Sequence, residues 1–543
     1  MTIIQTDTPD SRSGAGPIPI AALAFGTGIL AVVFKIVLLA QDAFPFNADE
    51  AVVALMARHI LAGELPVFFY GQAYMGSLDA LLVAAAFRVV GESITGVRLV
   101  QCVLYGSTVA TAVVLAWRLH RKLWLAGAAG LLLAVPSVNT MLYTTVSLGG
   151  YGEALLIGAG LLLAAWESWC APRSWLSALA WGLLAGVGIW AFGLVLVFVV
   201  PSAALVAMSL RRIDRRAAVR RGLLVIAGGI VGLLPWLGWT IRNGPGAAVR
   251  ELAGSAIAGV GPQGLLAALT FRGLNLLLFG ATVVVGLRPP WSVEWLSPWL
   301  APLALGFWLA VAVYMFGALR RRDAARPGRW MLAGVIGMTL LGFLVTPFGA
   351  DPSGRYFLPL IVPMALFAAE LLVAIRERYG RAWAALPLAA ILIFHLSAAA
   401  RAVSAEPGFT TQFDASTRID HEQDAALVRF LLAQGETRGY TNYWVAYPLA
   451  FLSQEQLLFV PELAYHPDLR HTARDNRYPP YAEAVASASR VAYITTGQAL
   501  LEDRLRAGFR QLGVEWREAA VGDYHVFYDL SRPVRPEMLD LAP

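Results

Sequence analysis

Long apolar runs dominate the first 400 residues of this chain, and several extend over about 18 residues or more. About 20 helical residues cross the roughly 30 Å hydrocarbon layer of a membrane, and a helix satisfies its backbone hydrogen bonds internally. Charged residues make up only 14% of the chain, against about 25% in an ordinary soluble domain. The sequence therefore predicts a polytopic α-helical membrane protein.

We predict about eleven spanning helices, at residues 19–40, 96–117, 123–141, 152–169, 175–190, 192–210, 222–241, 297–319, 330–347, 356–375 and 382–400. The first is too long for a signal-peptide core, so we interpret it as a retained anchor. Three further segments are amphipathic, short or interrupted by polar residues, and are predicted to lie as helices in the outer interface: 49–63, 76–90 and 264–286.

Basic residues divide unevenly between the loops that join these spans. With the N-terminus inside, the short cytoplasmic loops hold eighteen Lys and Arg: 118–122, 170–174, 211–221, 320–329 and 376–381. The longer loops on the other side hold seven Arg and no Lys. Because basic loops stay cytoplasmic, this bias predicts an inside N-terminus. The net charge of +6 thus reflects topology, and we expect contact with membrane lipids and not with nucleic acid.

The composition changes at about residue 401, after which 33 of the 78 charged residues lie. We predict a small soluble α/β domain outside the cytoplasm, with helices at 420–435 and 498–512 and strands at 456–461 and 490–496. The chain thus divides into a cytoplasmic tail (1–18), a transmembrane domain (19–400) and this domain (401–543). The two cysteines of the whole chain, Cys102 and Cys170, lie in or beside predicted spans, so a disulfide framework is not expected.

Asp49 and Glu50 lie near the start of the first long outer loop. Asn47, with Glu50 three residues later, resembles a capping box, and acidic residues favour a helix N-terminus. Two adjacent acids at the membrane surface are also suited to act as a general base or to hold a cation. The residues alone leave both interpretations open.

Four short motifs follow one another along residues 19–400: Asp49-Glu50, Gly91-Glu92-Ser93-Ile94-Thr95-Gly96-Val97-Arg98, Arg118-Leu119-His120-Arg121-Lys122 and Ser353-Gly354-Arg355-Tyr356-Phe357-Leu358-Pro359. In their order and spacing they resemble the GT-C superfamily of membrane glycosyltransferases. The resemblance is to the protein O-mannosyltransferases and the aminoarabinose transferases acting on lipid A, that is, to enzymes like glycosyltransferase family 39.

The resemblance implies a bacterial inner-membrane enzyme that takes a sugar from a polyprenyl-phosphate donor. An acceptor outside the cytoplasm, which can be a lipid, a glycan or a protein, attacks with inversion, and Asp49 matches the family's catalytic acid. We assign Asp49, Glu50 and Glu153 to catalysis. The one candidate cofactor is a divalent cation, with Asp49 and Glu153 as its candidate ligands.

Glu153 begins the fourth predicted span, where relatives place a second acid, although a solvated helix start explains it equally well. Tyr151 precedes it and is assigned to substrate binding. Arg355, beside Tyr356, is implied as a phosphate contact, and the alternative is a local ion pair with Asp351. Arg288 is a weaker candidate for the same contact.

One departure from the family concerns the segment before the second interfacial helix. Many relatives carry Lys-Pro or Pro-Pro there, whereas this chain has Tyr70-Gly71-Gln72-Ala73-Tyr74-Met75-Gly76. We assign Gln72 and Tyr74 to binding of the sugar or acceptor, and a structural role is the alternative. In the soluble domain, an aromatic stretch favours core packing over stacking on sugars: Tyr440, Tyr443, Trp444 and Tyr447.

Two other classes of function remain as alternatives. A transporter or flippase for lipid-linked glycans needs polar groups deep within several helices, and the predicted spans are nearly free of acids. A non-catalytic GT-C-like binding protein is compatible with the missing lysine. The sugar transferase is the expectation we carry forward.

Overall fold

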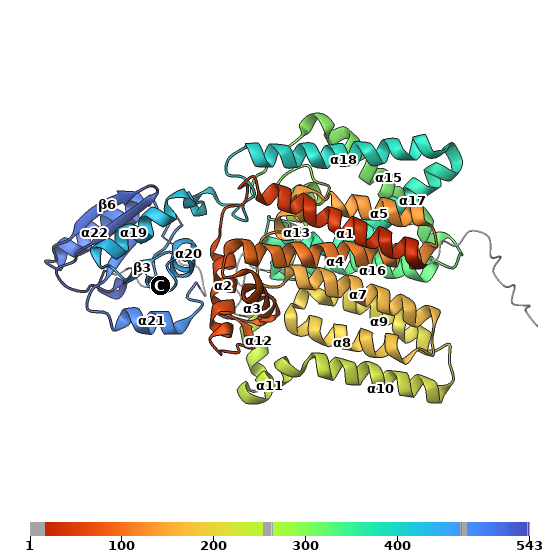
Figure 1. The fold of residues 1–543 in the computed structure, drawn as a ribbon, viewed down its shortest axis with the longest axis horizontal. Coiled ribbons are helices and arrows are strands. Elements are labelled where there is room, and N and C mark those ends of the chain that lie inside the picture. The colour runs from red at the N-terminus through yellow and green to blue at the C-terminus, as the bar shows by residue number, and fades with distance from the viewer. Residues whose placement is uncertain are drawn as a thin grey trace, which may run out of the picture.

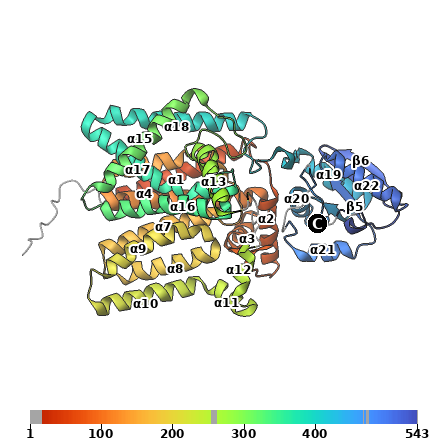
Figure 2. The ribbon, with the colours of Figure 1, turned by 180° about the vertical axis from the view of Figure 1, so that it is seen from behind.

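The computed structural model describes residues 17–253, 262, 264–466, 468–469, 475–539 and 541. A bundle of long helices forms one part of the molecule, and a smaller domain containing a sheet covers one end of it (Figures 1 and 2). The predicted N-terminal tail lies outside these residues except for its last two positions.

The helices of the larger part are α1 (Pro17–Leu39), α2 (Ala48–Leu61), α3 (Leu78–Val90), α4 (Ile94–His120), α5 (Leu123–Ala134), α6 (Val138–Tyr143), α7 (Tyr151–Cys170), α8 (Trp175–Ala191), α9 (Leu196–Leu210), α10 (Arg215–Gly232), α11 (Leu234–Asn243), α12 (Gly246–Ala253), α13 (Leu265–Asn275), α14 (Ala281–Val284), α15 (Ala301–Arg320), α16 (Arg326–Val345), α17 (Ile361–Tyr379) and α18 (Arg381–Ser404). A short hairpin, β1 (Phe68–Phe69) and β2 (Gln72–Gly76), separates α2 from α3.

Within the described residues, nine helices are long and apolar enough to cross a membrane, or ten if the bent pair α10–α11 is one span. The prediction of a multi-pass helical membrane protein is therefore confirmed. Large apolar side chains of these helices are exposed on the outside of the bundle, as lipid contact requires: Phe25 on α1, Leu309 on α15 and Ile393 on α18 are all more than half exposed.

Two predicted spans are wrong in detail, and proline explains both. Residues 123–141 do not form one helix, because Pro136 pushes Val135 out of the helical conformation and separates α5 from α6. The segment 222–241 belongs to α10 and α11, which meet at 65° where Pro235 lies in the first turn of the second helix.

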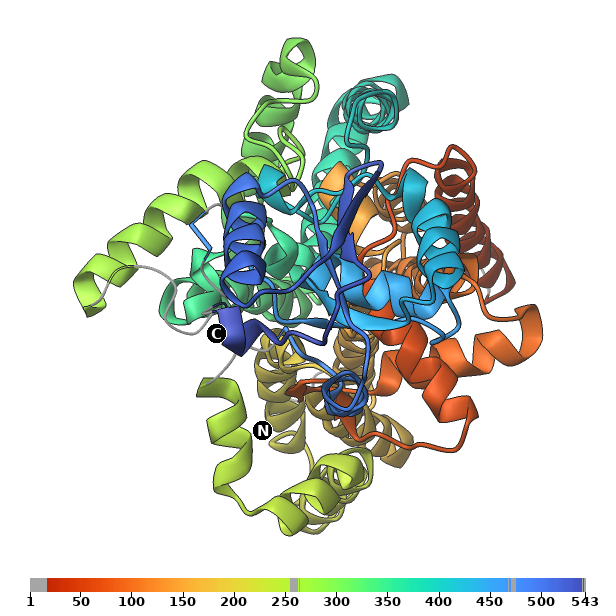
Figure 3. The ribbon, with the colours of Figure 1, turned by 90° about the vertical axis from the view of Figure 1, so that its left-hand side faces the viewer.

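Helices that cross the bundle direction lie at the end covered by the smaller domain. Figure 1 shows α2 running across the ends of the long helices, and Figure 3 shows α13 and α14 lying lengthwise in a view down the bundle. The segment from Leu265 to Val284 passes the length test for a span, yet this direction agrees with the predicted interfacial helix. The helix α2 is flat as predicted, but it is covered rather than exposed: most of it is buried.

The smaller domain contains a five-stranded sheet in the order β4-β3-β5-β7-β6. Its strands are β3 (Arg438–Thr441), β4 (Leu458–Pro461), β5 (Ala492–Thr495), β6 (Arg517–Val521) and β7 (Tyr524–Tyr528), and its helices are α19 (Asp424–Gln434), α20 (Tyr443–Leu452), α21 (Pro479–Ala486) and α22 (Ala499–Gln511). The first three strands are parallel, and β7 and β6 continue antiparallel. The predicted α/β domain is thus confirmed.

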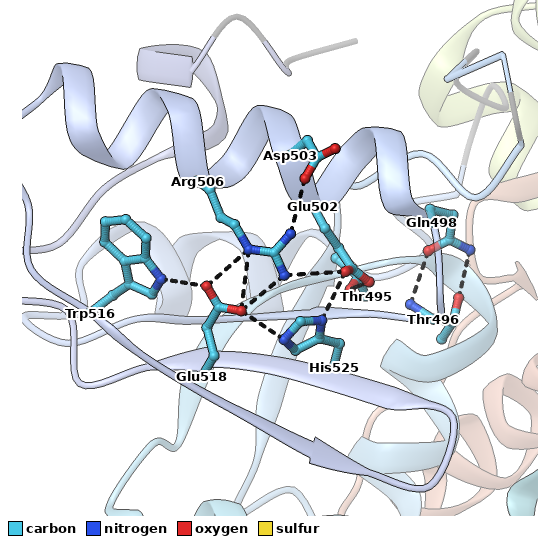
Figure 4. Close-up of polar contacts among 9 residues, drawn as sticks. All are labelled: Thr495, Thr496, Gln498, Glu502, Asp503, Arg506, Trp516, Glu518 and His525. Atoms are coloured by element: carbon cyan, nitrogen blue, oxygen red, sulfur yellow. Dashed lines mark hydrogen bonds and ion pairs between the residues drawn. The ribbon is translucent and has the colours of Figure 1, made fainter.

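A network of charged side chains fastens α22 to the antiparallel edge of this sheet (Figure 4). Arg506 contacts Glu518 at 2.9 Å and Asp503 at 3.1 Å. His525 lies between Glu502, at 2.9 Å, and Glu518, at 3.0 Å. The guanidinium of Arg506 holds the pKa of Glu518 at about 2, well below its ordinary value.

The closest helix packing in the bundle is between α8 and α10. Glycines of both helices face the partner's backbone: a Cβ added at Gly228 would lie 2.5 Å from the carbonyl oxygen of Leu179. The same applies to Gly182, whose added Cβ would collide with the carbonyl of Val225. In a membrane, such small residues let two helix backbones approach and gain van der Waals contact.

We therefore expect Gly228→Val to separate α8 from α10 and to destabilise the protein by about 1–3 kcal/mol. Gly222→Val is the matched control, because an added Cβ at Gly222 on the same helix meets no atom within 4 Å. Thermal unfolding in detergent measures both. Equal stability of the two variants would contradict this packing.

Candidate active site

Asp49 lies in the first turn of α2, at the boundary between bundle and soluble domain. Asn47 caps this helix: its side chain accepts a hydrogen bond from the Glu50 backbone N–H, at 3.1 Å. The Asp49 carboxylate accepts a hydrogen bond of 2.5 Å from the hydroxyl of Tyr443, on α20. Burial, with the charge of Asp49, raises the pKa of Tyr443 well above its ordinary value, so the hydroxyl keeps its proton and donates.

Glu50 points the other way, into the bundle, and is fully buried. Arg98 of α4 donates to both of its oxygens, at 3.0 and 2.9 Å, and the Asn47 amide donates to it at 3.2 Å. The capping interpretation of Asn47 and Glu50 therefore describes their geometry. Since both oxygens of Glu50 are occupied, Glu50 positions α2 and leaves Asp49 as the acid available for chemistry. The assignment of Glu50 to catalysis stays a prediction that this geometry does not favour.

Arg477, in the segment leading to α21, lies beside Asp49 and is buried. Its guanidinium lies 5.2 Å from the ring centroid of Tyr443. With the Gln72 amide oriented to face it, the guanidinium donates to the Gln72 oxygen at 2.9 Å, and the Gln72 nitrogen donates to the Tyr74 hydroxyl at 3.2 Å. The Nε–H of Arg477 has no hydrogen-bond partner among the described residues. The predicted pair Gln72 and Tyr74 thus adjoins Asp49 through an arginine of the soluble domain.

The backbone permits this contact because Gly71 takes a positive φ of +69° in the hairpin turn. A Cβ at Gly71 would come within 3.2 Å of the Arg477 Cα. Asp475, two residues earlier, is also near Asp49: burial raises its pKa to about 7, with Arg477 opposing and Asp49 adding to the shift. A carboxyl of this pKa exchanges protons readily near neutral pH.

Arg355 and Tyr356 begin the turn that leads into α17. Arg355 forms an ion pair of 2.6 Å with Asp351 and lies 5.2 Å from the ring centroid of Tyr356. Its Nε–H is buried and has no partner within the described chain. The ring of Tyr151 lies beside that of Tyr356, with ring centroids 6.4 Å apart. The local ion pair is therefore present, and it leaves one donor of Arg355 for a ligand.

Tyr74 belongs to the first group through Gln72, whose nitrogen donates to its hydroxyl, and it lies close enough to Tyr356 of the second group to interact with it electrostatically. The structure thus places seven predicted or newly found side chains in one region: Asp49, Tyr443, Arg477, Gln72, Tyr74, Tyr356 and Arg355.

Arg288 is buried and belongs to a different arrangement. Its donors go to the carbonyl oxygens of Phe279, Pro289, Ser292 and Pro352 and to the Thr282 hydroxyl. Because these acceptors come from three outer segments, Arg288 fixes the loops around the site. Its assignment as a phosphate contact stays a prediction that this geometry does not favour.

Glu153 is buried at the start of α7, and neither of its oxygens receives a hydrogen bond from an N–H or hydroxyl group of the described residues. Its acidic neighbour is Asp79 of α3, which is close enough to interact with it electrostatically. Gln101 donates to Asp79 at 2.8 Å, and Ser147 also donates to it. The described residues contain no group of three or more His, Cys, Asp or Glu able to hold a metal ion, so the divalent cation stays a prediction.

Three site residues were missed from the sequence: Arg477, Asp475 and Asp79. Tyr443 was expected in the core, and it is buried, but its hydroxyl reaches Asp49. Nothing in the local sequence marks these positions, because each acts through a contact with a distant segment. The amphipathic pattern of 76–90 placed Asp79 in an interfacial helix without indicating which face it occupies.

No protein-family model and no curated protein matches this sequence. Solved structures do match it. ArnT from Cupriavidus metallidurans in the apo state gives a TM-score of 0.60 at 12% identity, covering 95% of this chain and 99% of that one. ArnT bound to undecaprenyl phosphate gives 0.57 at 13%, with the same coverage. The Archaeoglobus fulgidus oligosaccharyltransferase in complex with Zn and sulfate gives 0.51 at 13%, covering 87% and 67%.

The protein is therefore a multi-pass membrane protein whose helical bundle carries a small C-terminal domain built on a sheet. More particularly, it has the GT-C fold, and the resemblance predicted from the motifs is confirmed for the fold. At these identities the comparison fixes the fold, and residue roles rest on the site itself.

The Glu50–Arg98 pair yields a prediction about stability. Glu50→Gln leaves the buried guanidinium of Arg98 without its counter-charge, and we expect a loss of about 3–5 kcal/mol in the free energy of unfolding. Asp49→Asn is the matched control one residue away, and it should unfold like the wild type. Thermal unfolding in detergent compares them, and a Glu50→Gln variant as stable as the wild type would contradict the proposed positioning role.

A second prediction concerns the contact that holds the soluble domain on α2. Glu455 accepts hydrogen bonds from His59 at 2.9 Å and Tyr481 at 2.7 Å, with Arg58 at 3.5 Å. Burial raises the pKa of Glu455, but these partners outweigh it and lower the pKa from 4.5 to about 2. A lowered folded-state pKa means that this stabilisation is present above pH 4.5 and is lost as the pH falls toward 2.

We expect hydrogen exchange of α2 and α20 to increase as the pH is lowered from about 5 to 2.5, after correction for the intrinsic exchange rate. Glu455→Gln should show the increased exchange already at neutral pH and little further pH dependence. Identical pH profiles for the two proteins would exclude Glu455 as the group responsible.

Proposed function

We propose that this protein transfers a sugar from a polyprenyl-phosphate donor to an acceptor at the membrane face covered by the soluble domain. The observation that carries the proposal is the Asp49 carboxylate, held by Tyr443 and adjoining Arg477, Gln72 and Tyr74. The GT-C fold supports it, since one solved structure with this fold holds undecaprenyl phosphate.

In the proposed reaction, an acceptor hydroxyl attacks the anomeric carbon while Asp49 takes its proton. The bond from that carbon to the phosphate oxygen breaks, and polyprenyl phosphate leaves with the electron pair. The attack inverts the anomeric configuration. Since the leaving group is a phosphate anion, it needs positive charge rather than a proton, and an arginine supplies both charge and donors.

We assign Arg355 to binding of the donor phosphate, because its Nε–H is free and its guanidinium lies beside the ring of Tyr356. The neighbouring rings of Tyr356 and Tyr151 offer apolar faces against which the donor can pack. The hairpin of this chain lacks the lysine that many relatives carry. We assign the positive charge at this place to Arg477, because its guanidinium donates to Gln72 of the hairpin. Gln72 and Tyr74 offer amide and hydroxyl groups to the sugar or the acceptor.

We further propose that the protein lies in the bacterial inner membrane with its N-terminus in the cytoplasm and the soluble domain outside. The arrangement of charge supports this topology. The loops 118–122, 211–221, 320–329 and 376–381 lie at the end of the bundle opposite the soluble domain (Figure 1). Under the positive-inside rule, basic loops gathered at one end of the bundle mark that end as cytoplasmic, which puts Asp49 on the outer side.

The test is sugar transfer by purified protein in lipid, with a panel of radiolabelled polyprenyl-phosphate sugars. We expect Asp49→Asn to lower transfer by about 10²–10⁴-fold, the usual contribution of a general base, without changing thermal unfolding. Asp42→Asn is the matched control: it removes an exposed acid in the same loop, at a positive φ of 52° that asparagine tolerates.

Full transfer by Asp49→Asn would exclude Asp49 as the base. Wild-type protein that binds these lipids but never consumes them would instead favour the transporter or the non-catalytic binding protein.

A further inference from the structure

An open cavity lies at the end of the bundle opposite Asp49. Its volume is about 1120 Å³, and it lies between α1, α5, α17 and α18. Its apolar wall includes Leu23, Trp124, Leu131, Val373 and Leu388. Three of the helices that form it are long enough to span the membrane, so this wall is at acyl-chain depth.

The rim of this cavity is basic. Arg121 and Lys122 come from the α4–α5 loop, Arg376 from the last turn of α17 and Arg381 from the start of α18. Its one acid, Glu377, pairs with Lys122. The three arginines have no ion-pair partner among the residues that the structure describes.

Two of these arginines are oriented by tryptophan rings. The Arg121 guanidinium lies 4.4 Å from the ring centroid of Trp117, and that of Arg376 lies 5.3 Å from Trp124, which itself lines the cavity. Stacking on an aromatic face holds a guanidinium while leaving its N–H edge free, and that edge matches a pair of phosphate oxygens.

We propose that this cavity is a binding site for one anionic glycerophospholipid, with its acyl chain along the apolar wall and its phosphate among Arg121, Arg376 and Arg381. Charge decides between lipids: three unpaired guanidinium groups favour a headgroup with net negative charge over one whose phosphate is balanced by its own choline. Basic pockets between membrane helices are suited to such headgroups. The site is separate from the donor site and does not depend on the proposed sugar transfer.

The experiment is native mass spectrometry of the delipidated full-length protein, titrated with phosphatidylglycerol or with phosphatidylcholine of the same acyl chains. We expect wild-type protein to retain phosphatidylglycerol preferentially. The double variant Arg376→Gln/Arg381→Gln should lose about tenfold or more of that affinity. The matched control is Arg215→Gln/Arg216→Gln, which removes two exposed arginines at the same end of the bundle but outside the cavity.

A second variant tests the apolar part with every arginine in place. An added Cβ at Gly127 meets only Leu23, at 3.8 Å, so Gly127→Leu extends into the cavity and should also lower retention of phosphatidylglycerol. Thermal unfolding confirms that each variant is folded. Equal retention of the two lipids by the wild type, unchanged retention by both variants, or displacement by free glycerol phosphate would each overturn the proposal. No sugar donor is present, so the result is independent of transfer activity.

Discussion

Arg98 and Glu50 meet beneath the first turn of α2, where neither charge reaches water. A bidentate pair in such a place is costly to form and more costly to break, so it fixes the relative position of the two helices that carry it. One helix is the long span α4, and the other is the crossing helix α2. Because Glu50 is held inward, Asp49, one residue earlier, is directed toward the soluble domain. The location of the candidate base is therefore a consequence of its neighbour's ion pair.

The soluble domain contributes the remaining side chains of the candidate site on α2. Tyr443 reaches Asp49 from α20, and Arg477 reaches Gln72 from the segment before α21. Since the domain contributes a hydroxyl to the Asp49 carboxylate and a guanidinium to the adjoining Gln72, the candidate site is complete only while the domain is docked. The His59 and Glu455 contact, and the stacking of Tyr70 on Tyr478 at 4.7 Å, lie in the same interface. The docking contacts and the candidate active site thus share one surface.

How much of this structure the sequence predicts depends on whether a feature is local or joins distant segments. Hydropathy and length predict spans well because the bilayer imposes them on each segment separately. They fail at Pro136 and Pro235, where a local backbone constraint interrupts an otherwise apolar run. The capping box at Asn47 was visible because it is local. The contact of Tyr443 with Asp49 joins residues 394 positions apart, and no periodicity contains that information.

The interior charges of the bundle bear on the choice between an enzyme and a transporter. A transport path needs polar groups that stay available to a moving substrate. Here Lys35 donates to two threonine hydroxyls at 2.7 Å and to the Met141 carbonyl. Arg329 is engaged by Glu370 at 2.7 Å and by Asp323. These groups tie helices together, whereas the donors left free on Arg355 and Arg477 lie at the end covered by the soluble domain. The interior charges of the bundle are therefore held in fixed contacts, while the buried free donors of Arg355 and Arg477 lie in the region of the candidate base, and this favours transfer over transport.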